Sequence, residues 1–163
     1  MDKKAGYTLV EIIVVVASVG LIMTAMIGVI LGSFRAQNRT KSDNKITENG
    51  SWIMNELRKN VFNSFGDQVE CASDAKSVQI KSLVDGQITT LSCDQVNSKI
   101  ASTSAVERVL NNSEVTVSGC TNFVTCEQVD DKVYGVTFNF TLESTVEGVG
   151  SSRVFSTKVT LRN

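Results

Sequence analysis

Ile12–Leu31 reads IIVVVASVGLIMTAMIGVIL, twenty residues without a charged side chain. At about 1.5 Å per residue, a helix of that length spans ~30 Å, which is the thickness of the hydrocarbon core of a bilayer. The alternative is a buried core helix, but a domain in a chain of 163 residues could not cover such a helix on every face. The stretch therefore predicts a membrane-spanning segment.

The overall composition narrows the class of protein. The chain has 163 residues, a net charge of −1, no proline, no histidine and four cysteines. That length predicts one domain with a core of its own, and the near-neutral charge argues against a strongly basic nucleic-acid-binding protein. Histidine is the commonest general base and the commonest metal ligand, so its absence rules out His-dependent triads and zinc-hydrolase sites.

A short basic leader precedes the apolar stretch. Met1–Gly6 reads MDKKAG, with two lysines just before the small residues. An ordinary secretory signal has its small-residue cleavage site after the apolar stretch, but no A-x-A-like site follows Leu31. The small-residue junction lies instead at Gly6–Tyr7, where cleavage would keep the membrane helix in the mature protein.

Glu11 places a carboxylate near the start of the apolar stretch. A lone carboxylate costs a few kcal/mol at mid-membrane and less near the interface, so Glu11 could simply reach the interface. If the chain begins at Tyr7, the new α-ammonium lies one helical turn away. Glu11 could then pair with that ammonium in its own chain or in a neighbour, and pairing between neighbours would set the axial register of an assembly.

These residues together resemble a known processing site. Gly6–Val15 (GYTLVEIIVV) is similar to the cleavage site of type IV prepilins and pseudopilins, and the resemblance covers about the first 35 residues. It implies that a prepilin peptidase cuts after Gly6 and methylates the new N-terminus. Phenylalanine usually follows the cut in the family, so Tyr7 is a conservative departure, while the family's glutamate falls on Glu11. The resemblance also implies a pilin-like fold and assembly into a filament.

The charges around the apolar stretch conflict with this topology. Counting positive charges alone would place the C-terminal side in the cytoplasm, because four basic residues follow the stretch and two precede it: Arg35, Arg39, Lys41 and Lys45, against Lys3 and Lys4. The resemblance implies the opposite orientation, with the leader in the cytoplasm. We expect a single-pass inner-membrane protein with an extracytoplasmic C-terminal domain, which later joins a cell-surface pilus or a pseudopilus.

Residues 33–65 are expected to continue as an amphipathic helix. Ile46, Ile53, Leu57 and Val61 recur at helical spacing, although Asn49-Gly50 is expected to loosen or bend the helix. For Trp52 we favour core packing over a surface position. This span has six basic and three acidic residues, net +3, and residues 63–163 have eight basic and twelve acidic residues, net −4.

After about residue 70 the hydrophobic period changes to that of β-strands. The best strands are Val136–Leu142 and Phe155–Leu161, joined by an expected loop at Ser144–Ser152. Shorter strands are expected around Val78–Ile80, Ile88–Leu91 and Val115–Val117, with a turn at Asp85-Gly86, and a short strand or a turn of helix around Val106–Leu110. The predicted fold is α+β, with a long N-terminal helix packed on a mostly antiparallel sheet. The predicted segments are a leader (1–6), a transmembrane and assembly helix (7–32), the helix extension (33–65) and a globular β-rich domain (66–163).

The four cysteines all follow the membrane stretch. An even number in a small exported domain favours disulfides, and four cysteines allow three pairings. Zinc is the alternative, but the chain has no C-x-x-C pair and no histidine. We hypothesise that Cys71 pairs with Cys93 and that Cys120 pairs with Cys126.

No catalytic arrangement is evident, and no cofactor or metal is expected. Asp130-Asp131 is expected to be a solvated turn, and no phosphate-binding glycine motif occurs. The sequence thus predicts a pilin-like structural subunit, a minor pilin or pseudopilin, rather than an enzyme. Its expected partners are the prepilin peptidase, other pilin-like subunits, an inner-membrane assembly platform and lipid, with no specific nucleic acid. A surface pilus, a secretion pseudopilus and a DNA-uptake filament stay open, as does an uncleaved membrane-anchored binding module. An anchored enzyme has the least support.

Overall fold

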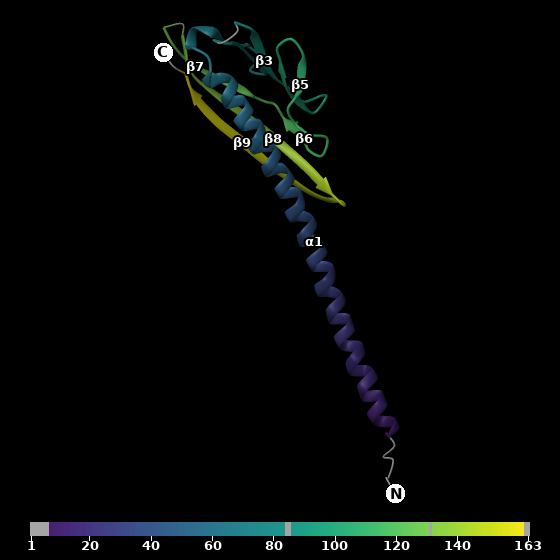
Figure 1. Cartoon of the computed structure of the whole chain (residues 1–163). Coiled ribbons are helices and arrows are strands. Elements are labelled where there is room, and N and C mark those ends of the chain that lie inside the picture. The colour runs from purple at the N-terminus through teal and green to yellow at the C-terminus, as the bar shows by residue number, and fades with distance from the viewer. Residues whose placement is uncertain (1–6, 84–85, 131, 162–163) are drawn as a thin grey trace. The chain divides into compact units, whose positions relative to one another are not determined.

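The computed structural model describes residues 7–83, 86–130 and 132–161. The predicted leader, Gly6 included, and the Asp85 and Asp131 positions of the two predicted turns therefore lie outside the described residues. The chain divides into two compact units, Met1–Asn38 and Arg39–Asn163. Helix α1 contributes to both units, and all the strands belong to the second (Figure 1).

Helix α1 (Leu9–Phe62) is 54 residues long. Asn49-Gly50 does not end the helix, which continues through both residues. Gly50 is buried, and a Cβ at this position would overlap the ring of Phe155. The glycine is thus where the helix approaches a neighbouring aromatic side chain, and this packing outweighs the low helix propensity of glycine.

An antiparallel sheet of five strands follows α1 and a 3₁₀ turn, η1 (Gly66–Gln68). Its strands are adjacent in the order of the chain, each pairing with the next. They are β1 (Val69–Cys71), β2 (Ser77–Lys81), β3 (Ile88–Asp94), β4 (Lys99–Thr103) and β5 (Glu107–Val109). The predicted strands around Val78 and Ile88 correspond to β2 and β3, whereas β1 and β4 lack a clear alternating pattern and were not predicted.

A second antiparallel sheet is built around β8. Strand β8 (Lys132–Val146) pairs with β9 (Val149–Thr160) along one edge, and with β7 (Val124–Val129) and β6 (Thr116–Gly119) along the other. The predicted loop at Ser144–Ser152 is wrong, because the two strands continue almost to each other. Glu147 and Gly148 alone form the turn, with φ of 48° and 78°, which fits the two-residue hairpin turn that matches the twist of the strands.

The core of the second unit lies where the C-terminal half of α1 meets the strands. The predicted helical stripe Ile46, Ile53, Leu57 and Val61 is buried. Four phenylalanines, Phe123, Phe138, Phe140 and Phe155, are also buried. The ring of Phe123 lies tilted against those of Phe138 and Phe140, and Phe140 stacks on Phe155, with ring centroids 5.4–6.4 Å apart. This arrangement confirms the predicted α+β fold, a long N-terminal helix packed on antiparallel sheet.

The prediction of core packing for Trp52 is wrong. The side chain of Trp52 is 40% exposed, and the guanidinium of Arg108 on β5 lies 5.5 Å from the centre of its ring. Trp52 lies beside the buried stripe of α1, and a cation–π contact covers it in part.

Candidate functional site

The N-terminal turn of α1 holds the residues that carry the resemblance. The hydroxyl of Thr8 accepts a hydrogen bond from the backbone N–H of Glu11 (3.3 Å), and the carbonyl of Thr8 accepts one from the N–H of Ile12 (3.3 Å). Thr8 is thus the N-cap of the helix, and Glu11 occupies the third helical position of the T-x-x-E capping pattern. This cap was not predicted, although the spacing of Thr8 and Glu11 in the sequence is that of a capping pattern.

Tyr7 and Glu11 lie one helical turn apart beside the same shallow groove. The groove is also lined by Ile12, Val15 and Val16. The side chain of Tyr7 is 80% exposed, and Glu11 is exposed as well. A carboxylate near the positive end of a helix dipole is favourably placed. The predicted cleavage residue Gly6 lies outside the described residues, so the geometry of the bond to be cut stays a prediction.

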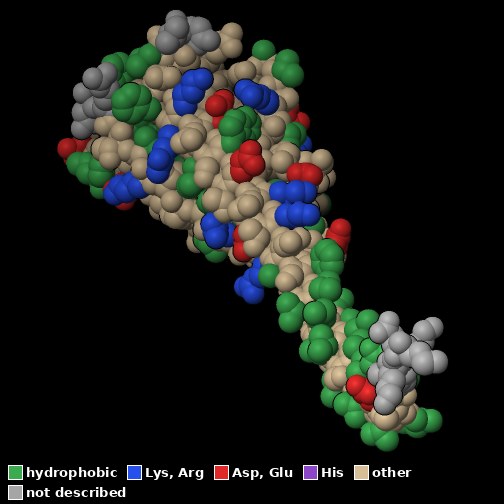
Figure 2. All heavy atoms as spheres, turned by 60° about the horizontal axis from the view of Figure 1, so that its bottom comes forward, with side chains coloured by type: hydrophobic (Ala, Val, Ile, Leu, Met, Phe, Trp, Pro, Cys, Tyr) green, Lys and Arg blue, Asp and Glu red, His purple; other side chains and the backbone are tan. Residues whose placement is uncertain are grey.

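The apolar stretch of α1 has the composition and length of a membrane span. Its most apolar 18-residue window has a mean hydropathy of 2.7, and none of it is buried within the protein. On the face drawn in Figure 2, hydrophobic side chains gather on this part of α1, whereas charged ones gather on the second unit. A core helix would be covered by its own chain, so this surface requires lipid or other helices to cover it.

The hydroxyl groups of Ser18 and Thr24 within the stretch, and of Ser33 just after it, are satisfied inside the helix. Ser18 donates to the carbonyl of Val14 (2.8 Å), Thr24 to that of Leu21 (2.9 Å) and Ser33 to that of Val29 (2.9 Å). An unsatisfied polar group costs several kcal/mol in hydrocarbon. The carboxylate of Glu11, in the first turn of the helix, differs from these hydroxyl groups. In an apolar setting it would still need a partner.

All four cysteines form disulfides, but the hypothesised pairing is wrong. Cys71 bonds to Cys126 and Cys93 to Cys120. Strand β2 separates Cys71 on β1 from Cys93 on β3, which sets their backbones ~10 Å apart, beyond the ~7 Å reach of a disulfide. Similarly, the chain turns at Cys120–Phe123 and then extends, which carries Cys126 away from Cys120. Both bridges join the five-stranded sheet to the β6–β9 region.

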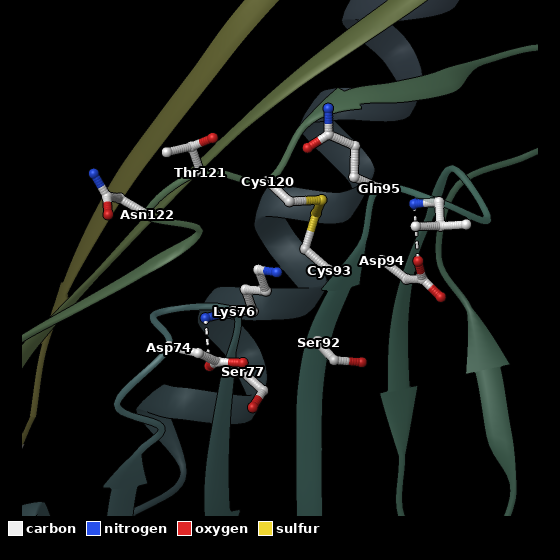
Figure 3. Close-up of a pocket in the computed structure, with 11 residues that line it drawn as sticks. Asp74, Lys76, Ser77, Ser92, Cys93, Asp94, Gln95, Cys120, Thr121 and Asn122 are labelled. Atoms are coloured by element: carbon white, nitrogen blue, oxygen red, sulfur yellow. Dashed lines mark hydrogen bonds between the residues drawn. A yellow bond between two sulfur atoms is a disulfide. The ribbon is translucent and has the colours of Figure 1, made fainter.

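A polar hollow surrounds the Cys93–Cys120 bridge. Figure 3 shows Lys76, Gln95, Thr121 and Asn122 around it. Several of its polar groups are already used by the protein itself. The carboxylate of Asp74 accepts a bond from the backbone N–H of Lys76 (3.0 Å), and the amide of Gln95 donates to the carbonyl of Ser118 (2.9 Å).

The carboxylate of Asp94 stabilises the turn that follows it in the chain. It accepts bonds from the backbone N–H of Val96 (2.9 Å), the backbone N–H of Asn97 (3.1 Å) and the amide of Asn97 (2.5 Å). The bonds from Asn97, followed by that from Val96, hold the pKa of Asp94 below its usual value. A carboxylate that is stabilised in its charged form in this way is a turn-forming group and a poor general base at neutral pH.

Comparisons with known proteins add no relative. No family model, no curated protein and no solved structure matches the chain. Among the residues that the structure describes, no three His, Cys, Asp or Glu side chains are grouped to hold a metal ion. The N-terminal turn, with its exposed apolar helix and Glu11, is therefore the feature that any functional interpretation must explain.

Proposed function

We propose that this chain is a type IV pilin-like structural subunit, a minor pilin or a pseudopilin. A prepilin peptidase cuts after Gly6 and methylates Tyr7, and the N-terminal helix then moves from the inner membrane into a filament of pilin-like subunits at an assembly platform. The observation that carries the proposal is the exposed, membrane-length apolar helix that begins with Thr8 as its cap and Glu11 in its first turn.

Either lipid or other helices can cover the apolar side chains of this helix. In the bilayer, lipid covers the apolar side chains, but a carboxylate there is unfavourable without a partner. In a bundle of pilin-like helices, apolar neighbours replace the lipid, and the N-terminal ammonium of a neighbouring subunit can neutralise Glu11. Assembly would therefore remove a cost that the membrane state retains.

The cysteines support the extracytoplasmic location of the second unit. Two disulfides in one small domain are typical of oxidising compartments and are rare in the cytosol. The leader would then be cytoplasmic, where the expected peptidase acts. The alternative is a membrane-anchored extracytoplasmic binding module that keeps its leader and does not polymerise.

The first test is the intact mass and N-terminal peptide of the protein purified from its own membranes. We expect a chain that begins at Tyr7 with one added methyl group. The Gly6→Val variant, made in the same cells, should keep its first six residues. A wild-type chain that still begins at Met1 in cells with an active prepilin peptidase would overturn the proposal and leave the anchored binding module.

The assembly role of Glu11 is tested separately from its place in the helix. Glu11→Ala keeps the backbone N–H that bonds to Thr8, so membrane insertion should be retained while incorporation into the filament falls. Thr8→Val is the matched control: it removes the cap, at about 1 kcal/mol of helix stability, but keeps the carboxylate. Quantification of the subunit in sheared or purified filaments checks this, and normal incorporation of Glu11→Ala would count against the register role.

A further inference from the structure

Strand β9 leaves one edge of its sheet open over its full length. It pairs with β8 from Val149 to Thr160 without a register shift, and no described strand pairs with its other edge. By contrast, the β6–β8 and β7–β8 pairings both contain irregularities. Proteins usually protect such edges with short strands, bulges, proline or a covering segment, and β9 has 12 residues, no bulge and no proline.

The direction of each backbone group along β9 follows from one hydrogen bond. The N–H of Leu161 donates to the carbonyl of Tyr134 on β8 (2.9 Å). Bonded and non-bonded pairs alternate in an antiparallel ladder, so the odd-numbered residues of β9 bond to β8. The backbone groups of the even-numbered residues face the open edge: Gly150, Ser152, Val154, Ser156, Lys158 and Thr160.

The two cations on β9 are held by neighbours. Arg153 donates to the hydroxyl of Thr47 on α1 (2.7 Å), and the ammonium of Lys158 lies 2.6 Å from a carboxylate oxygen of Glu127 on β7. Lysine and arginine on an edge strand usually discourage pairing. Here each is bonded to a side chain from another element, and Val154 in the middle of the edge is 69% exposed.

A basic groove runs between the end of this edge and the last turns of α1. It has a volume of about 460 Å³, and its lining includes Asn55, Arg58, Lys59, Phe62, Lys158 and Thr160. No carboxylate lines it among the described residues. The Nε–H of Arg58 donates a hydrogen bond to the hydroxyl of Thr157 (2.6 Å). Lys59 and Phe62 are exposed. The groove therefore complements acidic and apolar side chains.

We propose that β9 binds an extended segment of another polypeptide by strand addition, with acidic side chains of that segment facing Arg58 and Lys59. Backbone hydrogen bonds to the even-numbered residues of β9 supply the affinity, and the groove beside α1 supplies the preference for acidic and apolar side chains.

Antiparallel pairing with a second copy of β9 does not fit, an argument that rests on the proposed membrane anchoring. Strand β9 runs in the same direction as α1, because Asp43 bonds to Ser151, Thr47 to Arg153 and Arg58 to Thr157. Antiparallel pairing of two β9 strands would therefore set two α1 helices in opposite directions. Two chains anchored in one membrane by N-terminal helices run in the same direction.

The test measures binding of defined peptides to the full chain in detergent micelles. The probe is a fluorescent, capped peptide of about nine residues in which valine alternates with glutamate, and the control peptide alternates valine with lysine. By fluorescence anisotropy, we expect the glutamate peptide to bind ~10-fold or more tightly than the lysine peptide. Equal binding of the two peptides, or no binding of either, would overturn the proposal.

Variants separate the backbone edge from the groove. Ser156→Pro removes an edge-facing N–H that the domain does not use, as proline is tolerated at such positions, and should weaken binding ~10-fold. Ser156→Ala is its matched control and should bind as the wild type does. Val154→Pro provides a second edge variant if Ser156→Pro fails to fold, and Lys59→Glu should abolish the preference for glutamate. Equal binding by folded proline and alanine variants would exclude strand addition. Because binding is measured on the purified chain, its failure is distinguishable from failure of cleavage after Gly6.

Discussion

The two halves of α1 share a secondary structure but differ in what surrounds them. In the first unit, a Cβ built on Gly20, Gly28 or Gly32 meets nothing within 4 Å, whereas in the second unit a Cβ on Gly50 overlaps the ring of Phe155. The apolar side chains of the first half are exposed, whereas the stripe Ile46, Ile53, Leu57 and Val61 of the second half is buried. The first half thus has no cover from the described strands, while the buried stripe of the second half is covered by strands of its own chain.

This difference explains why the two regions tolerate change differently. An apolar helix in lipid is specified by composition and length, so many sequences satisfy it. The packed half is specified by shape at single positions, because a protein interior is as dense as an organic crystal. The chain divides into its two units between Asn38 and Arg39. Variants that change one unit only test whether the two units also unfold independently.

The largest expected effect comes from the disulfides, which lie only in the second unit. The two bridges close loops with sequence separations of 55 and 27 residues, for which chain entropy predicts about 4 and about 3.5 kcal/mol of stabilisation. Cys71→Ser/Cys126→Ser should therefore lower the free energy of unfolding of the second unit more than Cys93→Ser/Cys120→Ser does. Urea unfolding followed by the fluorescence of Trp52, the one tryptophan, measures both.

The helix of the first unit should not respond to these cysteine variants. Far-ultraviolet circular dichroism in micelles, at a urea concentration that unfolds the second unit, should retain the helical signal of the apolar stretch. Loss of that signal together with the tryptophan transition would mean that the two units unfold as one.

A smaller effect is expected from one methyl group placed in each half of the helix. Gly50→Ala forces Phe155 to move, which costs about 1–3 kcal/mol as overpacking and is offset in part by the ~1 kcal/mol gain in helix propensity. We expect a net loss of up to about 2 kcal/mol. Gly28→Ala is the matched variant in open space, where only the gain applies.

Thermal or urea unfolding of the second unit measures the Gly50 effect. The Gly50→Ala/Phe155→Leu double variant should recover part of the loss, since the smaller side chain makes room for the new methyl group. If Gly50→Ala were more stable than the wild type by the full gain in helix propensity, as in open space, the close approach of α1 to β9 would be wrong.

Local patterns in the sequence were enough to predict the long helix and the best strands. The uncharged stretch Ile12–Leu31, the stripe at Ile46, Ile53, Leu57 and Val61, and the alternation in Val136–Leu142 each carry their period within one segment. They fixed the α+β class because a helix and strands of this length have few ways to bury their apolar faces together.

Features that depend on distant segments were not predictable in the same way. Gly50 resembles a helix breaker in isolation, and only Phe155, far along the chain, explains it. The disulfide pairing depends on which strands are neighbours, and β2 separates Cys71 from Cys93. The Glu147-Gly148 turn was hidden by the small residues around it, which suit either a loop or strand ends. At the candidate site, the sequence predicted Tyr7 and Glu11 but missed the cap supplied by Thr8.

The smallest expected effect concerns the exposed ion pair between Glu127 and Lys158. The hydrogen bond that Lys158 donates to Glu127 lowers the pKa of Glu127 from its usual 4.5. The same bond raises the pKa of Lys158 from its usual 10.5. Because the pKa of Glu127 is lower in the folded state, its contribution is present above about pH 4.5 and is lost as the pH falls through the lowered value. The contribution of Lys158 is present below about pH 10.5 and is lost as the pH rises through the raised value.

Wild type and Glu127→Gln should therefore differ in stability at neutral pH and converge in acid, and added salt should reduce the difference because the pair is exposed. Urea unfolding of both proteins between neutral pH and about pH 3 measures this.

For a carboxylate of the first unit, the comparison of wild type with a Glu→Gln variant has a different expected result. Glu11→Gln should leave the unfolding of the second unit unchanged at every pH, because Glu11 lies in the other compact unit. A pH-dependent change in the unfolding of that variant would show that the two halves of α1 are coupled in stability. The two halves would then differ only in what surrounds their side chains.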